Sequence, residues 1–323
     1  MVYPPPKRRL LSMQNAFFHN VTLLAFARLL APLCLCFTTG DAHAGHELLL
    51  VTGLPGQAAF GAEMEATAKV WTEAAKRGGH SVQEIPTGSG PQLPRLQAAL
   101  AAVPADVPEP LWLVLLGHGS AQGKSPRFNL EGPDLSAEEL ALSLARLRRP
   151  VIVIAGFSCS GAFLKPLGAP GRIVVAATRT GAEENWTRFP RFFAAALAGL
   201  DADTNGDMQV SVFEAWQHAT RAAEASYKDQ GRLSTEHAAL DDLGEGKAAG
   251  LGLGLKAAQW HLVESAAEAA LAPGQRTRRE ALELELGQMR QRKEKLPPAQ
   301  YAEALEGLLL KLARVYAGMA EAE

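Results

Sequence analysis

Short runs of apolar residues alternate along the chain with longer segments in which apolar positions recur every three or four residues. The short runs end at glycine, proline or small polar residues, which is typical of buried strands in a parallel sheet. Alternation of such strands with helices predicts an α/β three-layer sandwich with a mostly parallel sheet. Strands are expected at residues 46–52, 81–85, 111–116, 151–155 and 172–177, with a short edge strand at 127–130. Helices are expected at 62–77, 93–102, 189–200 and 212–227, and one more begins with the capping-box sequence at Ser136.

A different pattern follows a glycine-rich stretch at residues 244–255, which predicts a linker. Beyond it, Leu282, Leu286 and Met289 lie on one helical stripe, and two consecutive prolines then interrupt the chain. We expect a helical hairpin that packs on itself, on the α/β domain or on a protein partner. Its second helix has apolar residues in heptad spacing, at Tyr301, Leu305, Leu308, Leu312, Val315 and Met319.

The first 44 residues have the pattern of an export signal. Three basic residues, Lys7 to Arg9, precede a largely apolar run at 21–37, and Ala42-His43-Ala44 is a small-residue cleavage site. We expect an exported protein, periplasmic or secreted after cleavage near Ala44. A retained membrane anchor is the alternative, although Arg28 interrupts the apolar run and the run is short for a spanning helix.

Removal of this segment changes the composition. Of the three cysteines only Cys159 would remain, so no internal disulfide could form. The segment holds four of the 32 Lys and Arg residues and one of the 34 Asp and Glu residues, which leaves a net charge near −5 and argues against a nucleic-acid partner. The chain is expected to divide into a signal peptide (1–44), an α/β domain (45–243), a linker (244–278) and a helical hairpin (279–323).

Reactive side chains directly follow two of the predicted strands. His118 comes after the strand at 111–116, and Ser158 and Cys159 come after the strand at 151–155. Because ligands and catalytic groups gather at the carboxyl ends of parallel strands, these side chains are expected to lie near one another. A base beside a nucleophile is the arrangement that covalent hydrolysis requires.

These two strand ends resemble those of caspase-like cysteine peptidases, most closely the legumain-type branch in a bacterial-type form. The resemblance covers residues 46–242 and rests on strand-His-Gly-Ser, on strand-x-x-nucleophile-x-Ser-Gly and on the strand that follows. It implies a caspase-like sheet and a peptide or protein substrate, with no cofactor required. It also implies that His118 acts as general base or acid and that Gly119 supplies a backbone donor to the oxyanion.

The nucleophile departs from the family pattern. Alignment on Ser160-Gly161 places Ser158, and not Cys159, at the catalytic position. Three interpretations stay open: Ser158 is a serine nucleophile, Cys159 reaches the site through a shifted turn, or the fold has lost catalysis and binds a peptide or partner. Serine needs a well-oriented base more than cysteine does, because a thiolate forms at a far lower pKa.

A rival interpretation is a serine esterase of the α/β-hydrolase type. Residues 156–160 nearly match the G-x-S-x-G nucleophile elbow, with Ser160 in place of the last glycine, and 116–119 would then be an oxyanion loop. In α/β-hydrolases the acid and the histidine follow the nucleophile along the chain. The esterase interpretation therefore needs His218 or His237, whereas the caspase-like interpretation needs His118. The acid would be Asp201, Asp203 or Asp207.

Two polar segments near the end of the α/β domain are further candidates. Arg179 follows the strand at 172–177, where caspase-like enzymes line the substrate site, so Arg179 and Ser160 are candidate substrate-binding residues. The polar segment 235–242, with Glu236, His237 and two consecutive aspartates, is expected to be a solvated loop.

Residues 203–214 resemble an EF-hand calcium loop. Calcium prefers oxygen ligands at alternate positions and a bidentate glutamate at the twelfth. The sixth position, which should be a glycine, is Met208, so an ordinary Asp/Asn/Gly turn before the next helix is the competing interpretation. The candidate ligands are Asp203, Asn205, Asp207, Gln209, Ser211 and Glu214.

Overall fold

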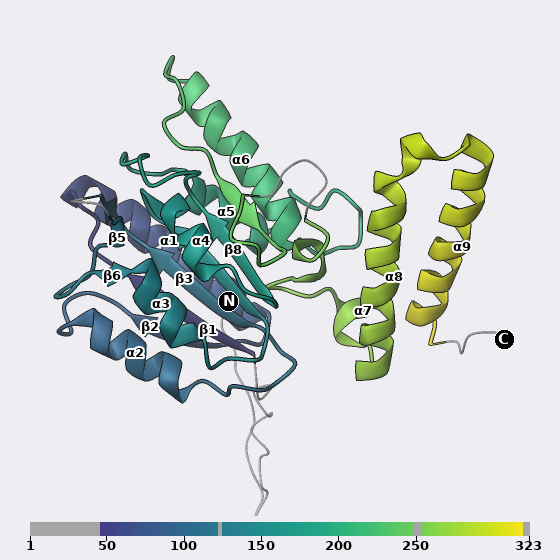
Figure 1. Cartoon of the computed structure of the whole chain (residues 1–323), viewed down its shortest axis with the longest axis horizontal. Helices are drawn as coiled ribbons and strands as arrows, with labels where there is room; N and C mark the ends of the chain where they lie inside the picture. The colour runs from purple at the N-terminus through teal and green to yellow at the C-terminus, as the bar shows by residue number, and fades with distance from the viewer. Residues whose placement is uncertain (1–45, 122–124, 249–253, 319–323) are drawn as a thin grey trace, which may run out of the picture. The chain divides into compact units, whose positions relative to one another are not determined.

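A six-stranded sheet lies at the centre of the computed structural model, which describes residues 46–121, 125–248 and 254–318 (Figure 1). The strand order is β2-β1-β3-β7-β8-β9, and every neighbouring pair is parallel except β8 with β9. The strands are β1 (Glu47–Thr52), β2 (Ser81–Ile85), β3 (Leu111–Leu116), β7 (Val151–Gly156), β8 (Arg172–Ala176) and β9 (Ala239–Asp241).

The two central strands, β3 and β7, are apolar on both faces because both faces are covered. Every residue of β3 and of β7 is buried. Residues of an antiparallel sheet with one wet face would alternate between apolar and polar, whereas these runs do not alternate. The register pairs Leu111 with Val151 and Leu116 with Gly156, so the two strands end side by side at the same edge.

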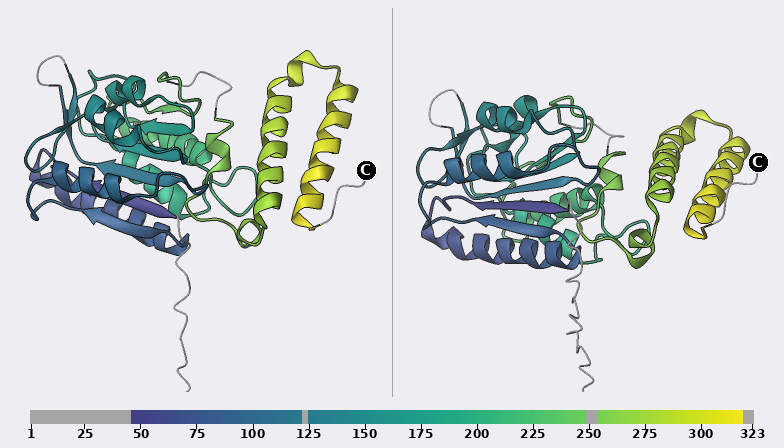
Figure 2. Two further views of the ribbon diagram at one scale, coloured as in Figure 1. Left: turned by 60° about the horizontal axis from the view of Figure 1, so that its bottom comes forward. Right: turned by 90° about the horizontal axis from the view of Figure 1, so that it is seen from below.

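Helices cover both faces of the sheet, which confirms the predicted three-layer sandwich (Figures 1 and 2). Alternate side chains along each central strand belong to the two different apolar clusters, as the period of two requires. One face packs against α1 (Ala58–Arg77), α5 (Phe189–Ala198) and α6 (Val212–Lys228). The other packs against α2 (Gln92–Ala102), α3 (Ala137–Leu144) and α4 (Leu164–Leu167), which follows the short 3-10 helix η1 (Ser160–Phe163).

A small antiparallel sheet follows the end of β3. It consists of β4 (Gly119–Ser120), β5 (Arg127–Phe128) and β6 (Leu135–Ser136) in that order. The expected edge strand at 127–130 is thus shorter and pairs within this second sheet. Ser136 forms the predicted capping box with Glu139, because each side chain bonds to the other residue's backbone N–H at the start of α3.

The segment 235–242 is not the solvated loop that its polar residues predict. Part of it forms β9, and the carboxylates of Glu236, Asp241 and Asp242 are buried. Each carboxylate accepts backbone N–H groups: Asp241 accepts four of them, from residues 243–246, at 2.7–3.2 Å. A carboxylate can be buried when such hydrogen bonds replace those that it makes with water. The polar residues of the sequence do not reveal where these partners lie.

The expected linker contains ordered elements. These are η2 (Ala257–Gln259) and α7 (Ala266–Ala269), while α8 (Pro273–Gln291) begins inside the range that we assigned to the linker. A β-bridge joins His261 to Ser211, and the Gln259 amide donates to the Glu280 carbonyl at 2.8 Å. Residues 256–272 therefore pack on their neighbours through specific contacts.

The predicted C-terminal helical hairpin is present. α8 and α9 (Pro298–Tyr316) run side by side in Figures 1 and 2, joined through η3 (Lys293–Lys295). Leu282, Leu308 and Val315 form their buried contact. At the base of α8, the buried Arg279 forms ion pairs with Glu268 and Glu283, which ties the hairpin to α7.

The described residues include no helix that is long and apolar enough to span a membrane. The expected signal peptide and its cleavage site near Ala44, together with Met319 of the heptad stripe, lie outside the described residues. Those interpretations therefore stay predictions.

Replacement of Asp241 tests the importance of the buried carboxylates. In Asp241→Ala, four backbone N–H groups lose their acceptor, and the free energy of unfolding should fall by about 1–3 kcal/mol. Asp229→Ala, at the exposed end of α6, should change it by less than about 0.5 kcal/mol. Urea unfolding followed by circular dichroism measures both, and equal stability of the two variants would show that the Asp241 bonds contribute nothing.

Candidate functional site

Ser158 and His118 meet at the carboxyl edge of the sheet. The Ser158 Oγ lies 3.4 Å from the His118 Nδ1. Because Leu116 pairs with Gly156 at the ends of β3 and β7, both side chains emerge two residues beyond a paired position. The half-buried imidazole therefore faces a serine hydroxyl, which is the arrangement of a base and an oxygen nucleophile.

Gly119 brings a backbone donor to the same hydroxyl. Its N–H donates to the Ser158 Oγ at 3.2 Å, and the Ser158 hydroxyl in turn lies 3.3 Å from the Gly119 carbonyl oxygen. A Cβ at position 119 would lie 2.0 Å from the Ser158 carbonyl oxygen, so only glycine allows this approach. A fixed N–H beside a nucleophile is suited to stabilising negative charge that develops on an adjacent oxygen.

Cys159 has the properties of a weak nucleophile. It is fully buried, and its Sγ lies 4.0 Å from the Gly119 carbonyl oxygen. Burial, followed by the negative charges of Glu184 and Glu183, raises the pKa of the thiol to about 11. A reactive cysteine needs the opposite shift, because the thiolate is the attacking species.

The turn at Cys159 has an unusual backbone conformation. Its φ is 63°, in the left-handed region that residues other than Gly, Asn and Asp rarely adopt. The Cys159 N–H donates to the Glu183 carbonyl at 2.8 Å, which leaves it unavailable as an oxyanion donor. Such a conformation persists only where the surrounding structure stabilises it, and here it directly follows the serine that faces His118.

The loop after β1 holds His118 in place. The His118 N–H donates to the Leu54 carbonyl at 2.8 Å, and a Cβ on Gly56 would lie 2.6 Å from the imidazole Cδ2. Gly56 has a φ of 75°, so the turn both requires glycine and leaves the space that the ring fills. The sequence alone does not reveal this contact, because it joins residues 62 positions apart.

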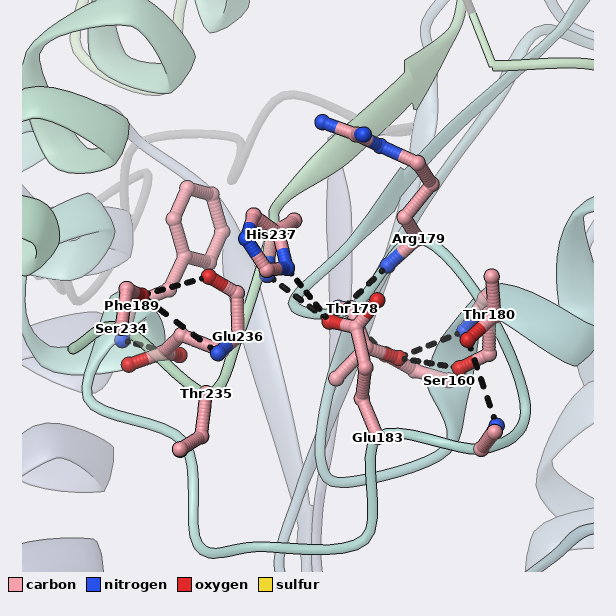
Figure 3. Close-up of polar contacts among 12 residues, drawn as sticks. Ser160, Thr178, Arg179, Thr180, Glu183, Phe189, Ser234, Thr235, Glu236 and His237 are labelled. Atoms are coloured by element: carbon pink, nitrogen blue, oxygen red, sulfur yellow. Dashed lines mark hydrogen bonds and ion pairs between the residues drawn. The ribbon is translucent and has the colours of Figure 1, made fainter.

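Ser160 lies beneath the site, not at a substrate surface. Its side chain is fully buried, its Oγ lies 3.2 Å from the Thr178 Oγ1, and it accepts the Thr178 N–H at 3.1 Å (Figure 3). Thr178 also accepts the Gly161 N–H at 2.9 Å. These bonds tie the turn after β7 to the end of β8, so Ser160 and Gly161 stabilise the turn that holds Ser158.

Arg179 and His237 lie on either side of Glu183 (Figure 3). Glu183 accepts the His237 backbone N–H at 2.8 Å, and its carboxylate lies 3.5 Å from the His237 Nδ1. The exposed Arg179 side chain extends away from these contacts (Figure 3). His218 lies within α6. Ser158 is thus paired with His118, and neither histidine required by the esterase interpretation contacts it within the described part of the chain.

The loop at 203–214 uses its candidate calcium ligands for its own backbone. Asp203 accepts the N–H groups of Gly206 and Met208, and Glu214 forms a capping box with Ser211 at the start of α6. Met208 has a φ of 65°, the conformation that glycine usually supplies at the sixth position. No cluster of three or more metal-binding side chains is found in the described ranges, and calcium binding stays a prediction from the sequence.

No protein-family model and no curated protein matches the chain. Among solved structures it is similar to the initiator caspase Dronc of Drosophila, with 12% identity, a TM-score of 0.45, and 64% of this chain and 82% of that one covered. It is similar to caspase-1 from Spodoptera frugiperda, with 12% identity, a TM-score of 0.42, and 62% and 87% covered. It is also similar to protein GSU0716 from Geobacter sulfurreducens, with 14% identity, a TM-score of 0.39, and 55% and 88% covered.

The close contact between Gly56 and the His118 ring predicts that a methyl group added at position 56 will slow the reaction of Ser158. Gly56→Ala should displace the imidazole from Ser158 and slow the reaction of Ser158 with a fluorophosphonate about tenfold or more. Gly61→Ala is the matched control, because its Cβ would meet only Pro55 at an ordinary 3.9 Å. Labelling rates measure both variants, and thermal unfolding verifies that they fold. Equal rates in folded Gly56→Ala and wild type would contradict this role of Gly56.

The raised pKa of Cys159 predicts a thiol with little reactivity near neutral pH. With a pKa of about 11, roughly one thiol in a thousand is ionised at pH 8, against about one in four for a free cysteine. Alkylation by iodoacetamide, followed at Cys159 by peptide mapping, should therefore still accelerate between pH 8 and pH 10. A fast reaction that levels off below pH 9 would mean that Cys159 is the activated group.

Proposed function

We propose that this protein hydrolyses peptide bonds, or related acyl bonds, as a caspase-like hydrolase with a serine nucleophile. Ser158 attacks and His118 accepts its proton. The observation that carries the proposal is the 3.4 Å contact between the Ser158 Oγ and the His118 Nδ1. The raised pKa of Cys159 favours Ser158 over the neighbouring thiol.

The proposed reaction has two halves. The Ser158 proton passes to the His118 Nδ1 as the Oγ bonds to the substrate carbonyl carbon, and the Gly119 N–H stabilises the resulting oxyanion. Collapse of this intermediate breaks the acyl bond, and the leaving amine takes the proton from His118. Water, deprotonated by His118, then attacks the acyl-serine, which releases the acid and restores the Ser158 hydroxyl.

This reaction requires the site to open. Ser158 is only 1% exposed, and its hydroxyl occupies the Gly119 N–H that the oxyanion would need. A substrate carbonyl oxygen must take the place of the Ser158 hydroxyl at the Gly119 N–H. Substrate binding is therefore coupled to a rearrangement around Gly119. Among the described residues, no carboxylate pairs with His118 to orient it, which predicts slow turnover for a serine enzyme.

The same burial of Ser158 favours a second candidate function, a caspase-like module that binds a peptide or protein without cleaving it. In that case the Ser158 hydroxyl is a structural group held by Gly119, and the helical hairpin is the docking element. Its helix α9 has apolar side chains that remain partly exposed, with Leu309 at 46%, Leu310 at 53% and Tyr316 at 41%. Replacement of His118 by Ala would then leave partner binding unchanged.

We also propose that the protein is exported, on the strength of the basic and apolar pattern of residues 1–44. A polypeptide substrate would then be met in the periplasm or outside the cell.

Paired substitutions test the enzymatic proposal. Ser158→Ala should reduce the hydrolysis of a mixed fluorogenic peptide and ester panel by at least about 10³-fold, because a nucleophile cannot be replaced by a methyl group. Cys159→Ala, at the adjacent buried position, should retain activity within about tenfold. Initial rates of the two variants and the wild type are compared, with circular dichroism as the test of folding.

Loss of activity in Cys159→Ala with retention in Ser158→Ala would mean that the thiol is the nucleophile. No hydrolysis by the folded wild type on any member of the panel would favour the binding module.

A further inference from the structure

The sequence of α9 is nearly symmetric about the bond between Leu308 and Leu309. Most residues that are equally far from this bond match in type, or are a glutamate on one side and a basic residue on the other. Two pairs combine a small residue with a larger apolar one, Ala302 with Val315 and Gly307 with Leu310. The matching pairs are Leu305 with Leu312, Ala304 with Ala313, Tyr301 with Tyr316, Glu306 with Lys311 and Glu303 with Arg314.

Such a sequence suits a helix that pairs antiparallel with a second copy of itself. A two-fold axis at the centre of α9 would bring each residue to the level of its match in the other copy. Because this kind of contact is isologous, every pairing occurs twice. Glu303 would meet the partner's Arg314 at both ends of the contact, whereas a parallel pair of helices would place like charges together.

Four of these residues share one face of α9, because they follow one another at intervals of four, three and four positions along the helix. This outer face consists of Glu303, Gly307, Leu310 and Arg314. The two-fold axis exchanges Glu303 with Arg314 and Gly307 with Leu310. The outer face of one copy therefore meets the outer face of the other.

The outer face is not the side of α9 that packs in the hairpin. Leu308 and Val315 are buried there against Leu282 of α8. On the outer face, by contrast, Leu310 is 53% exposed, and both charged residues are exposed as well. The face is thus accessible to a second chain.

Gly307 has no explanation within one chain. Glycine in the middle of a helix is unfavourable compared with alanine, and it is usually kept where another group approaches closely. A Cβ at position 307 would meet nothing within 4 Å, so no such group is present in the single chain. In the two-fold pair, the partner's Leu310 would fill this space, and both exposed leucines would become buried.

The charges of the outer face lack partners in the same way. The residues three and four positions after Glu303 are Glu306 and Gly307, so Glu303 has no oppositely charged neighbour on its own helix. Neither Glu303 nor Arg314 forms an ion pair with any residue that the structure describes. The helix dipole favours acids at the start and bases at the end, but it does not require matched distances from the centre.

We propose that two copies of this protein form a symmetric dimer in which their α9 helices pair antiparallel through the outer faces. Leu310 of each copy packs over Gly307 of the other, and Glu303 pairs with the partner's Arg314. A contact between two single helices is smaller than the interface of about 1,200–2,000 Å² in a typical stable complex, so the dimer is weak. The contact is independent of the reaction proposed at Ser158.

Sedimentation velocity of the full chain over a range of micromolar concentrations tests the proposal. The wild type should convert from monomer to dimer as its concentration rises. Glu303→Arg and Arg314→Glu should each raise the dissociation constant of the dimer at least about tenfold, because each places like charges together at both ends of the contact. Arg221→Glu, which reverses an exposed charge on α6, should leave the dimer unchanged.

The double variant with both Glu303→Arg and Arg314→Glu distinguishes this contact from a general effect of charge. Unlike charges would meet again across the two-fold axis, so most of the lost affinity should return. The two positions lie about 16 Å apart along one helix, too far to pair within the same chain. Recovery of the dimer therefore reports a contact between chains that run antiparallel.

Gly307→Gln tests the packing of Leu310. The larger side chain would occupy the space that the partner's Leu310 needs, so the dimer should weaken. Because glutamine favours helix more than glycine does, the temperature of thermal unfolding should not fall. Gly274→Gln is the matched control, since a Cβ at this position of α8 also meets nothing within 4 Å, and it should leave the dimer intact.

A wild type that stays monomeric at every concentration would overturn the proposal. So would a dimer that tolerates either single charge reversal, or a folded double variant that associates no more tightly than the single ones.

Discussion

The in-register parallel pairing of β3 with β7 brings His118 and Ser158 together. Since Leu116 pairs with Gly156, the two strands end together, and the residues that follow them must share one small region of the sheet edge. His118 and Ser158 meet there at 3.4 Å. A slip of one residue in either strand would exchange the side chains that pack in the two buried layers, so close packing in both layers maintains the pairing on which the site depends.

Hydrogen bonds of backbone N–H and C=O groups stabilise this edge of the sheet. Gly119 contacts Ser158 through both its N–H and its carbonyl, Ser160 bonds to Thr178, and Glu236 accepts the first N–H groups of α5. The side chains of Ser158, Ser160 and Glu236 thereby each satisfy a buried main-chain N–H group. The result is a closed site in which the hydroxyl of Ser158, and not the thiol of Cys159, faces the His118 imidazole.

The sequence pattern was sufficient for the five parallel strands of the main sheet, because a fully apolar run such as 111–116 has few alternatives inside a parallel sheet, but it did not predict β9. The sequence pattern did not predict contacts between residues far apart in the chain, or hydrogen bonds to buried polar side chains. Gly56 and His118 are 62 positions apart. The carboxylates of Asp241 and Asp242 are buried because backbone N–H groups satisfy them, from residues 243–246 for Asp241 and from residues 256–257 for Asp242. A pocket next to Trp186 could not be foreseen either, since it combines residues from α1, α5 and the segment after α6.

The most direct test of the central claim is to locate the covalent adduct formed by a fluorophosphonate. Peptide mass mapping of wild type, His118→Ala and His237→Ala would identify the modified residue and the histidine on which it depends. The account predicts modification at Ser158 that is lost in His118→Ala and retained in His237→Ala. Modification that persists without His118, or that requires His237, would contradict it.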